Sequence, residues 1–273
     1  MTFTPAIIGT GYAGWVALKR SQTQQAATLA NSAEIRRDED YFRARIGSVK
    51  TAEDLVKDRR LLKVALTAYG LEGDINSKAF IKKVLTDGTL KPEALANKLS
   101  DKQYLKLSAA FGFGDFTTPR TQLSDFADKT LALYRARTFE SAVGATNGDF
   151  RLALNAEREI AALAGRTLGE DTKWFTILGN APMQTVLQTA LGLPSSIASM
   201  DLDQQLRVFK ERAEAVFGSS SVSQFTNPDK LTKLLKTYLL RSEVASYDAQ
   251  SSSANAVLAM LQQTADLARN RSY

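Results

Sequence analysis

Apolar side chains recur with the 3.6-residue period of an α-helix along nearly the whole of this 273-residue chain. The clearest runs lie at 55–69, 202–217 and 231–239. We find no convincing run of alternating β-branched residues, the pattern that is typical of a half-buried strand. The periodicity therefore predicts an all-α, multi-helix fold, and the length is sufficient to bury a substantial core in one or two domains.

Several of these runs begin with residues that cap helices. Thr51 and the acid three residues later have the spacing of a capping box, in which each side chain accepts a backbone N–H at the helix start. Asp101 stands before another run, and Asn227 stands before a proline that suits the first helical turn. These residues predict three helix starts.

Three runs also end alike, with a glycine followed by an apolar residue, at Gly70, Gly112 and Gly192. Glycine adopts the left-handed conformation just past the last turn, and the apolar residue folds back on the helix, as in a Schellman cap. Around the first and third glycines the match extends to V-x-x-T-A-x-G-L. Two interpretations have equal weight: a recurrent cap, or a distant duplication that relates two helical halves.

Small and turn-forming residues cluster at 144–148, between two helical runs. They predict a boundary between an N-terminal helical half, 1–146, and a C-terminal helical half, 147–273. A tight helix–helix corner has the same signature, so packing of both halves as one domain stays an open alternative.

The composition removes several classes of chemistry, because the chain contains 0 Cys and 0 His. It can form no disulfide, and it has no cysteine nucleophile, no histidine acid–base catalyst and no zinc or iron site built from these residues. Asp74 and Asp201 fit helix N-termini better than metal ligands, and Glu157 and Glu159 point to different helix faces. We therefore predict no catalytic, cofactor-binding or metal-ligating residue and no cofactor, and expect that the protein is not an enzyme.

The net charge of +6 is a thin excess of basic residues for a chain of this length. Lysines and arginines are interleaved with acids, as over 34–40, which is typical of solvated helix faces with i,i+4 pairs. The sequence has no basic stripe with interleaved aromatic residues. We therefore expect no nucleic-acid partner.

Gly9, Gly11 and Gly14 match the G-x-G-x-x-G turn of dinucleotide-binding folds. That turn follows a buried parallel strand, whereas only three apolar residues precede this one, after a proline. We expect instead an N-terminal lead-in whose Trp15 docks on the body of the protein.

We expect neither a cleaved signal peptide nor a transmembrane segment. The first eighteen residues are uncharged, but Lys19 and Arg20 follow them, which reverses the order of a secretory signal. The longest uncharged stretch, 174–200, is interrupted by glycine, proline and amide side chains. A bilayer span needs about 20 mostly apolar residues.

Both ends of the chain are rich in alanine, glutamine and serine, at 21–32 and 251–266. The C-terminal region is nearly uncharged and carries a narrow apolar stripe, more like a coiled-coil seam than a face buried in a broad core. We predict that this stripe is an association surface, for self-association or for a protein partner, formed by Val257, Leu258, Leu261, Ala265 and Ala268.

A set of short strings carries a family resemblance. It includes Y-F-R-x-R-I at 41–46, A-E-D-L-V-x-D-R-R-L-L at 52–62, A-A-F-G-F at 109–113, L-G-N-x-P at 178–182 and A-L-G-L-P at 190–194. Together they resemble an alphaproteobacterial family of unknown function, domain of unknown function 1217, over most of the chain. The resemblance implies an all-helical fold and a flagellar or motility context, because genes of its members commonly lie beside flagellar genes. It supplies no catalytic residues.

Flagellar rod, hook and filament proteins pack through terminal helices of the same composition, and they lack cleaved signals and tend to avoid cysteine. The resemblance therefore implies a non-enzymatic structural or assembly protein of the flagellar system that associates through its terminal helices. The alternative is a cytoplasmic flagellar chaperone or regulator that binds a protein partner. The expected location is accordingly either the cytoplasm or, after export without a cleaved signal peptide, the flagellum.

Overall fold

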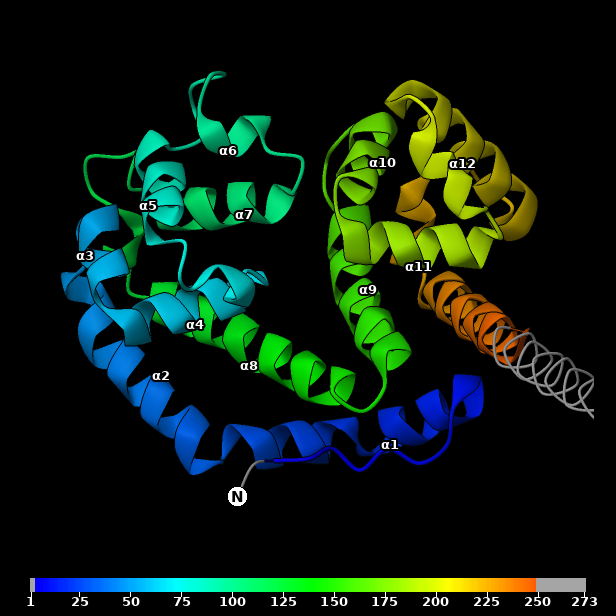
Figure 1. The fold of residues 1–273 in the computed structure, drawn as a ribbon, viewed down its shortest axis with the longest axis horizontal. Coiled ribbons are helices and arrows are strands. Elements are labelled where there is room, and N and C mark those ends of the chain that lie inside the picture. The colour runs from blue at the N-terminus through cyan, green and yellow to red at the C-terminus, as the bar shows by residue number, and fades with distance from the viewer. Residues whose placement is uncertain (1–2, 249–273) are drawn as a thin grey trace, which may run out of the picture.

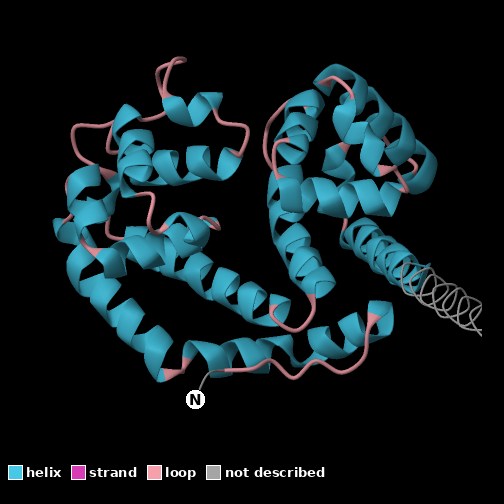
Figure 2. Ribbon diagram, in the orientation of Figure 1, coloured by secondary structure: helices cyan, strands magenta, loops and turns pink. Residues whose placement is uncertain are grey.

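The computed structural model describes residues 3–248, and every regular element in that range is helical (Figure 2), which confirms the predicted fold class. No helix in this range has the length and apolar character that crossing a membrane requires. We call the helix over 228–248 the C-terminal helix. The α-helices before it are α1 (Gly11–Ala30), α2 (Ala33–Arg45), α3 (Ala52–Lys57), α4 (Arg59–Tyr69), α5 (Lys78–Asp87), α6 (Leu95–Lys98), α7 (Lys102–Phe111), α8 (Phe126–Gly144), α9 (Gly148–Ala164), α10 (Glu170–Leu178), α11 (Ala181–Leu191) and α12 (Leu202–Phe217). Short 3-10 helices connect some of them: η1 (Ile46–Ser48), η2 (Glu72–Asp74), η3 (Arg120–Gln122), η4 (Ser195–Ser199) and η5 (Val222–Thr226).

The helices form two groups that lie side by side (Figure 1). The N-terminal group contains α2 to α8, and the C-terminal group contains α9 to α12 and the C-terminal helix. The groups meet at a corner between α8 and α9, where the Asn147 side chain accepts the Phe150 N–H and so caps α9. The division of the sequence at 146/147 falls in this corner. That the halves are separate domains stays a prediction, as does their duplication.

The first helix, α1, runs along both groups (Figure 1). Near its start Trp15 is buried, and its ring meets the Phe150 ring of α9 edge to face, with 6.1 Å between centroids. One turn later the Lys19 ammonium lies 2.8 Å from the Glu157 carboxylate of α9. Leu29, near the other end of α1, is buried in the N-terminal group. The expected docking of Trp15 is confirmed, and α1 ties the groups together.

The predicted caps are present. Both hydrogen bonds of the capping box form between Thr51 and Asp54. Gly70 and Gly192 end α4 and α11 with φ of +75° and +65°, and the leucine after each donates its N–H to the carbonyl five residues back, at 2.8 and 3.0 Å. Gly112 ends α7 with a single bond to the carbonyl four residues back, so its cap is the simpler left-handed form.

The apolar run over 55–69 is not one helix. Asp58 separates α3 from α4, because its backbone is extended and its side chain accepts the N–H groups of Arg60 and Leu61 at 3.0 and 3.1 Å. The apolar spacing continues on both sides of this break, so periodicity alone could not locate it.

The expectation of a solvated helix face over 34–40 is wrong for two acids. Asp38 and Glu39 of α2 are only 8% and 7% exposed. Asp38 accepts hydrogen bonds from Lys63 of α4 at 2.9 Å and from the Tyr134 hydroxyl of α8 at 3.0 Å. Glu39 receives two N–H groups of Arg135, also on α8. These acids join α2 to two other helices.

The three N-terminal glycines serve close packing at the start of α1. A Cβ on Gly14 would lie 2.7 Å from the carbonyl of Gly9, and one on Gly11 would overlap the Glu243 carboxylate of the C-terminal helix. Gly9 and Gly11 also have positive φ, which favours glycine. The residues from 3 to 8 form no strand, so the buried strand that precedes the turn in dinucleotide-binding folds is not present in this segment.

Candidate functional site

The association surface predicted from the sequence lies outside the described residues. This holds for all five of its members, Val257, Leu258, Leu261, Ala265 and Ala268. The structure does describe the C-terminal helix, which directly precedes this region in the sequence. It is the described element nearest in the sequence to the predicted surface.

The C-terminal helix has one buried face and one exposed apolar row. Leu234, Leu235, Tyr238 and Leu239 are buried, and the Tyr238 hydroxyl donates to Asp149 of α9 at 3.0 Å. Beyond these residues the helix leaves the core, and three apolar side chains face solvent. They are Leu240, Val244 and Tyr247, exposed by 43%, 61% and 75%.

The beginning of α1 lies against the C-terminal helix (Figure 1). The Thr10 hydroxyl donates to the Glu243 carboxylate at 3.0 Å. The Lys236 ammonium lies 5.3 Å from the centroid of the Tyr12 ring, within the range of a cation–π contact. The fold thus brings the two terminal helices together.

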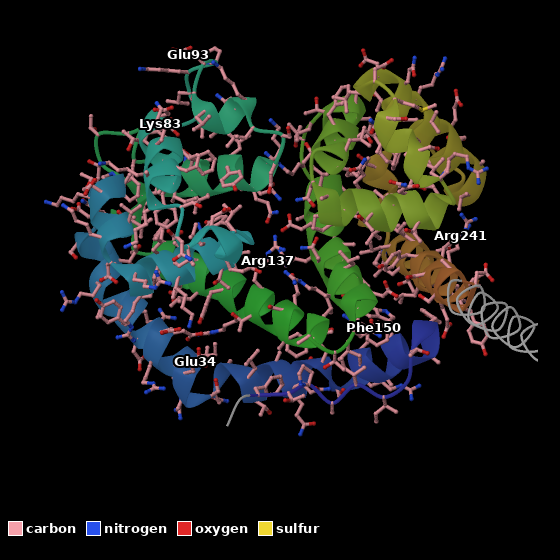
Figure 3. The ribbon with its side chains drawn as sticks, in the orientation of Figure 1. Glu34, Lys83, Glu93, Arg137, Phe150 and Arg241 are labelled. Atoms are coloured by element: carbon pink, nitrogen blue, oxygen red, sulfur yellow. The ribbon has the colours of Figure 1, made fainter. Side chains whose placement is uncertain are left out.

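A second feature is a cluster of five charged residues between the two groups, which we call the central charge cluster. It consists of Lys106 of α7, Arg137 and Glu140 of α8, and Arg158 and Glu159 of α9. Arg158 holds both oxygens of Glu140 at 2.9 and 3.1 Å, and Glu159 accepts from Lys106, Arg137 and Arg158 at 2.5–3.1 Å. Arg137 lies between α8 and α9 (Figure 3).

The chemistry of the central charge cluster does not suit acid–base catalysis. Burial opposes ionisation of Glu159, but Lys106, Arg158 and Arg137 outweigh it and lower the Glu159 pKa to about 2. A general acid or base works best with a pKa near the operating pH. Sequence reasoning missed this cluster and placed no carboxylates together, because its members come from three different helices and only the packing of those helices brings them together.

A cavity of about 740 Å³ lies between the N-terminal group and the start of the chain, and its lining includes Glu34, Lys63, Tyr134 and several hydroxyl side chains. Burial and the Asp38 carboxylate raise the Tyr134 pKa above its ordinary value. Burial lowers the Lys63 pKa, but Asp38 and Glu34 outweigh it and raise that pKa overall. Both groups are therefore held in their protonated forms, and neither can act as a base at neutral pH.

A serine and a lysine also lie together in the C-terminal group. Lys173, 3% exposed on α10, donates to the Ser223 hydroxyl of η5, and Glu170 accepts from both. The Lys173 Nζ also donates to the Ala164 carbonyl at 3.0 Å and lies 3.1 Å from the Glu170 carboxylate. Glu170 also accepts the Val222 N–H at 2.6 Å. The arrangement fastens η5 to α10 and is structural.

This arrangement gives a first testable prediction, for Glu170→Gln. Burial opposes ionisation of Glu170, but bonds from Ser223, Ser221 and Lys173 lower its pKa to about 2. A folded-state pKa below the unfolded one stabilises the fold above about pH 4.5, and this stabilisation is lost as the pH falls toward 2. About a third of the side chain is exposed, so solvent screening limits the loss at pH 7 to about 1–2 kcal/mol.

Urea unfolding followed by circular dichroism measures this difference between wild type and variant at pH 7 and pH 2.5. The difference in the free energy of unfolding should be smaller at pH 2.5 than at pH 7. Asp171→Asn is the matched control, because Asp171 is the next residue along and is 59% exposed. A difference of equal size at both pH values would contradict the assignment.

The two carboxylates expected at helix N-termini behave differently. Asp201 caps α12 by accepting the Gln204 N–H at 2.9 Å, as expected. Asp74 is the last residue of η2, where its carboxylate accepts a hydrogen bond from the Tyr104 hydroxyl at 2.6 Å. The prediction that Asp74 lies at a helix N-terminus is therefore wrong. Within residues 3–248, no group of three or more carboxylates is placed to hold a metal ion.

Comparison with known proteins identifies relatives but no activity. The crystal structure of an Agrobacterium tumefaciens protein, a structural genomics target, superposes with a TM-score of 0.71 at 26% sequence identity, covering 89% of this chain and 98% of that one. No curated protein matches the sequence. The family model described as "Protein of unknown function (DUF1217)" matches residues 68–231, which is more than half of the chain. This protein therefore belongs to the DUF1217 family, as the sequence resemblance implies.

Proposed function

We propose that this protein is a non-enzymatic structural or assembly protein in a flagellar context. It associates through its C-terminal helix, either with a second copy of itself or with a protein partner. The observation that carries the proposal is the exposed row formed by Leu240, Val244 and Tyr247. Single exposed apolar residues are common on protein surfaces. Three in succession at a spacing of four and then three residues form a seam of the kind that coiled coils bury.

The sequence continues this spacing without interruption. Alternate steps of four and three residues from Tyr247 reach Ser251, Ala254, Leu258, Leu261, Ala265 and Ala268, four of which belong to the predicted association surface. Small side chains at such positions permit close approach of two helices, and leucines supply the buried apolar area. The exposed row and the predicted surface therefore fit one continuous seam.

The non-enzymatic part of the proposal is supported by the three polar sites described above. Glu159, Tyr134 and Lys63 all have pKa values displaced away from neutrality, and Lys173 is held by a carboxylate and a carbonyl. The flagellar part is supported by the family resemblance, in which genes of members commonly lie beside flagellar genes.

Deleting residues 250–273 tests the association. We expect the deletion to abolish self-association or partner binding, because it removes most of the seam, while the helical content of the remaining chain is retained. Light scattering coupled to size-exclusion chromatography, together with capture of flagellar proteins, measures the first effect, and circular dichroism measures the second. Unchanged association would refute the proposal.

Localisation tests the flagellar context. A tagged protein is followed in motile cells of its source, with and without a working flagellar export apparatus, in the cytoplasm, purified hook–basal bodies and medium. Export-dependent appearance in the organelle or medium is the expected result. Retention in the cytoplasm of both strains would favour a chaperone or regulator instead.

A further inference from the structure

A cavity of about 290 Å³ opens between the two helix groups, directly beside the central charge cluster. Its apolar wall includes Leu133 of α8, Leu163 of α9 and Met183 of α11. Its polar wall includes Lys106, Arg137, Arg158, Glu159 and Arg166. This volume is at the small end of the range for ligand pockets, so it fits a compact molecule.

The charges around the cavity do not balance. The central charge cluster has three cations, Lys106, Arg137 and Arg158, against two carboxylates, Glu140 and Glu159, and Arg166 adds a further cation to the cavity lining, so positive charge is in excess. A buried charge without a counter-charge is costly.

Arg137 is the cation of the cluster with a buried hydrogen-bond donor that lacks an acceptor among the described residues. Its side chain is 13% exposed, and the donor is its Nε–H. Burial and the neighbouring Arg158 lower the Arg137 pKa, and the carboxylates of Glu140, Glu159 and Glu72 offset this only in part. An added anion would oppose the repulsion from Arg158.

Arg166 supplies a further cation where the cavity meets solvent. It is exposed, and it forms no ion pair within residues 3–248. A guanidinium free of other partners is suited to bind a carboxylate.

We propose that this cavity binds a small monocarboxylate with an apolar body. The excess of positive charge around the cavity favours an anion, and Arg137 and Arg166 are the residues that recognise its carboxylate. The hydrocarbon part of the ligand packs against Leu133, Leu163 and Met183. Inorganic phosphate lacks an apolar part and would leave this wall without a partner.

Isothermal titration of the full chain with hexanoate tests the proposal. We expect saturable binding of one hexanoate per chain, with no binding of hexanol, which has the body without the charge, or of inorganic phosphate, which has the charge without the body. Arg166→Gln is expected to weaken hexanoate binding about tenfold, since it removes one charge-assisted hydrogen-bond partner. Arg36→Gln is the control, because it removes the same charge from an exposed site on α2 that does not line the cavity.

A second variant blocks the cavity without changing its charges. Ala162 is an exposed residue of α9 that lines the cavity, and Ala162→Trp is expected to abolish hexanoate binding while thermal unfolding remains close to that of wild type. Absence of hexanoate binding to wild type would overturn the proposal. So would binding that is unchanged in both variants, or phosphate binding as tight as hexanoate binding.

Discussion

Replacing Glu159 with glutamine is expected to lower the free energy of unfolding by about 3–5 kcal/mol, the cost of removing one partner from a buried ion network. Glu159 is 13% exposed and accepts hydrogen bonds from Lys106, Arg137 and Arg158. The variant would leave these three cations with Glu140 as the remaining carboxylate of the cluster. Urea unfolding at pH 7 measures the loss.

Glu157→Gln is the matched control for this experiment. Glu157 lies on the same helix two residues earlier, is 33% exposed and pairs with Lys19 at 2.8 Å. Its replacement should cost less than about 1 kcal/mol, as for other solvent-exposed ion pairs. Equal losses in the two variants would show that the central charge cluster does not stabilise the junction between the groups.

The pH dependence of the Glu159 effect follows from its lowered pKa. Because the folded-state pKa is about 2 and the ordinary value is 4.5, the stabilisation is complete above about pH 4.5 and is lost as the pH falls toward 2. The difference between wild type and Glu159→Gln should therefore shrink over that interval, and a difference that grows on acidification would contradict the assignment.

Val244→Asp in the full chain is expected to weaken association at least tenfold. Val244 is 61% exposed and occupies the centre of the exposed row, where an aspartate would place a charge inside the seam once it is buried. The fold should not change, because the side chain already faces solvent. Sedimentation velocity over a range of protein concentrations measures the effect.

Ala245→Asp introduces the same charge one residue further along the same helix. Ala245 is also exposed, but one residue turns the helix by about 100°, so the new charge lies beside the seam and not in it. Association should be nearly unchanged. A similar loss of association in both variants would indicate a general effect of the added charge and would contradict the role of the seam.

Features that depend on neighbours in the sequence could be predicted. The capping box at Thr51 and the glycine caps at Gly70 and Gly192 involve partners within five residues, so the local sequence contains all of the information. The break at Asp58 is equally local, yet it was hidden by apolar spacing that continues across it. Helix period and caps thus account for the fold class.

Features that depend on distant residues could not be predicted. Lys106 and Glu159 are separated by 53 residues, and Glu39 and Arg135 by 96. An acid within a mixed charged run has the same local appearance whether its partner is water or a buried arginine. Only the packing of α2, α7, α8 and α9 decides between these outcomes.

The exposed row on the C-terminal helix could have been predicted from the spacing of its residues in the sequence. The alternate steps of four and three residues extend back from Leu258 to Leu240, but the core run at 231–239 overlaps the same helical region and conceals the change of face. Only the exposed fractions of the side chains distinguish the buried face of this helix from its exposed row. The five residues predicted as the association surface stay a prediction.

The way α1 lies across both groups constrains the order in which the protein folds during synthesis. α1 is synthesised before the helices that it contacts: the ring that packs on Trp15 belongs to Phe150, and the acceptor for the Thr10 hydroxyl belongs to Glu243. Chains generally fold from the N-terminus as they emerge, but α1 can complete these contacts only after α9 and the C-terminal helix have been synthesised. The ring contact of Trp15 thus requires that synthesis has passed Phe150, and the Thr10 hydrogen bond requires that it has passed Glu243.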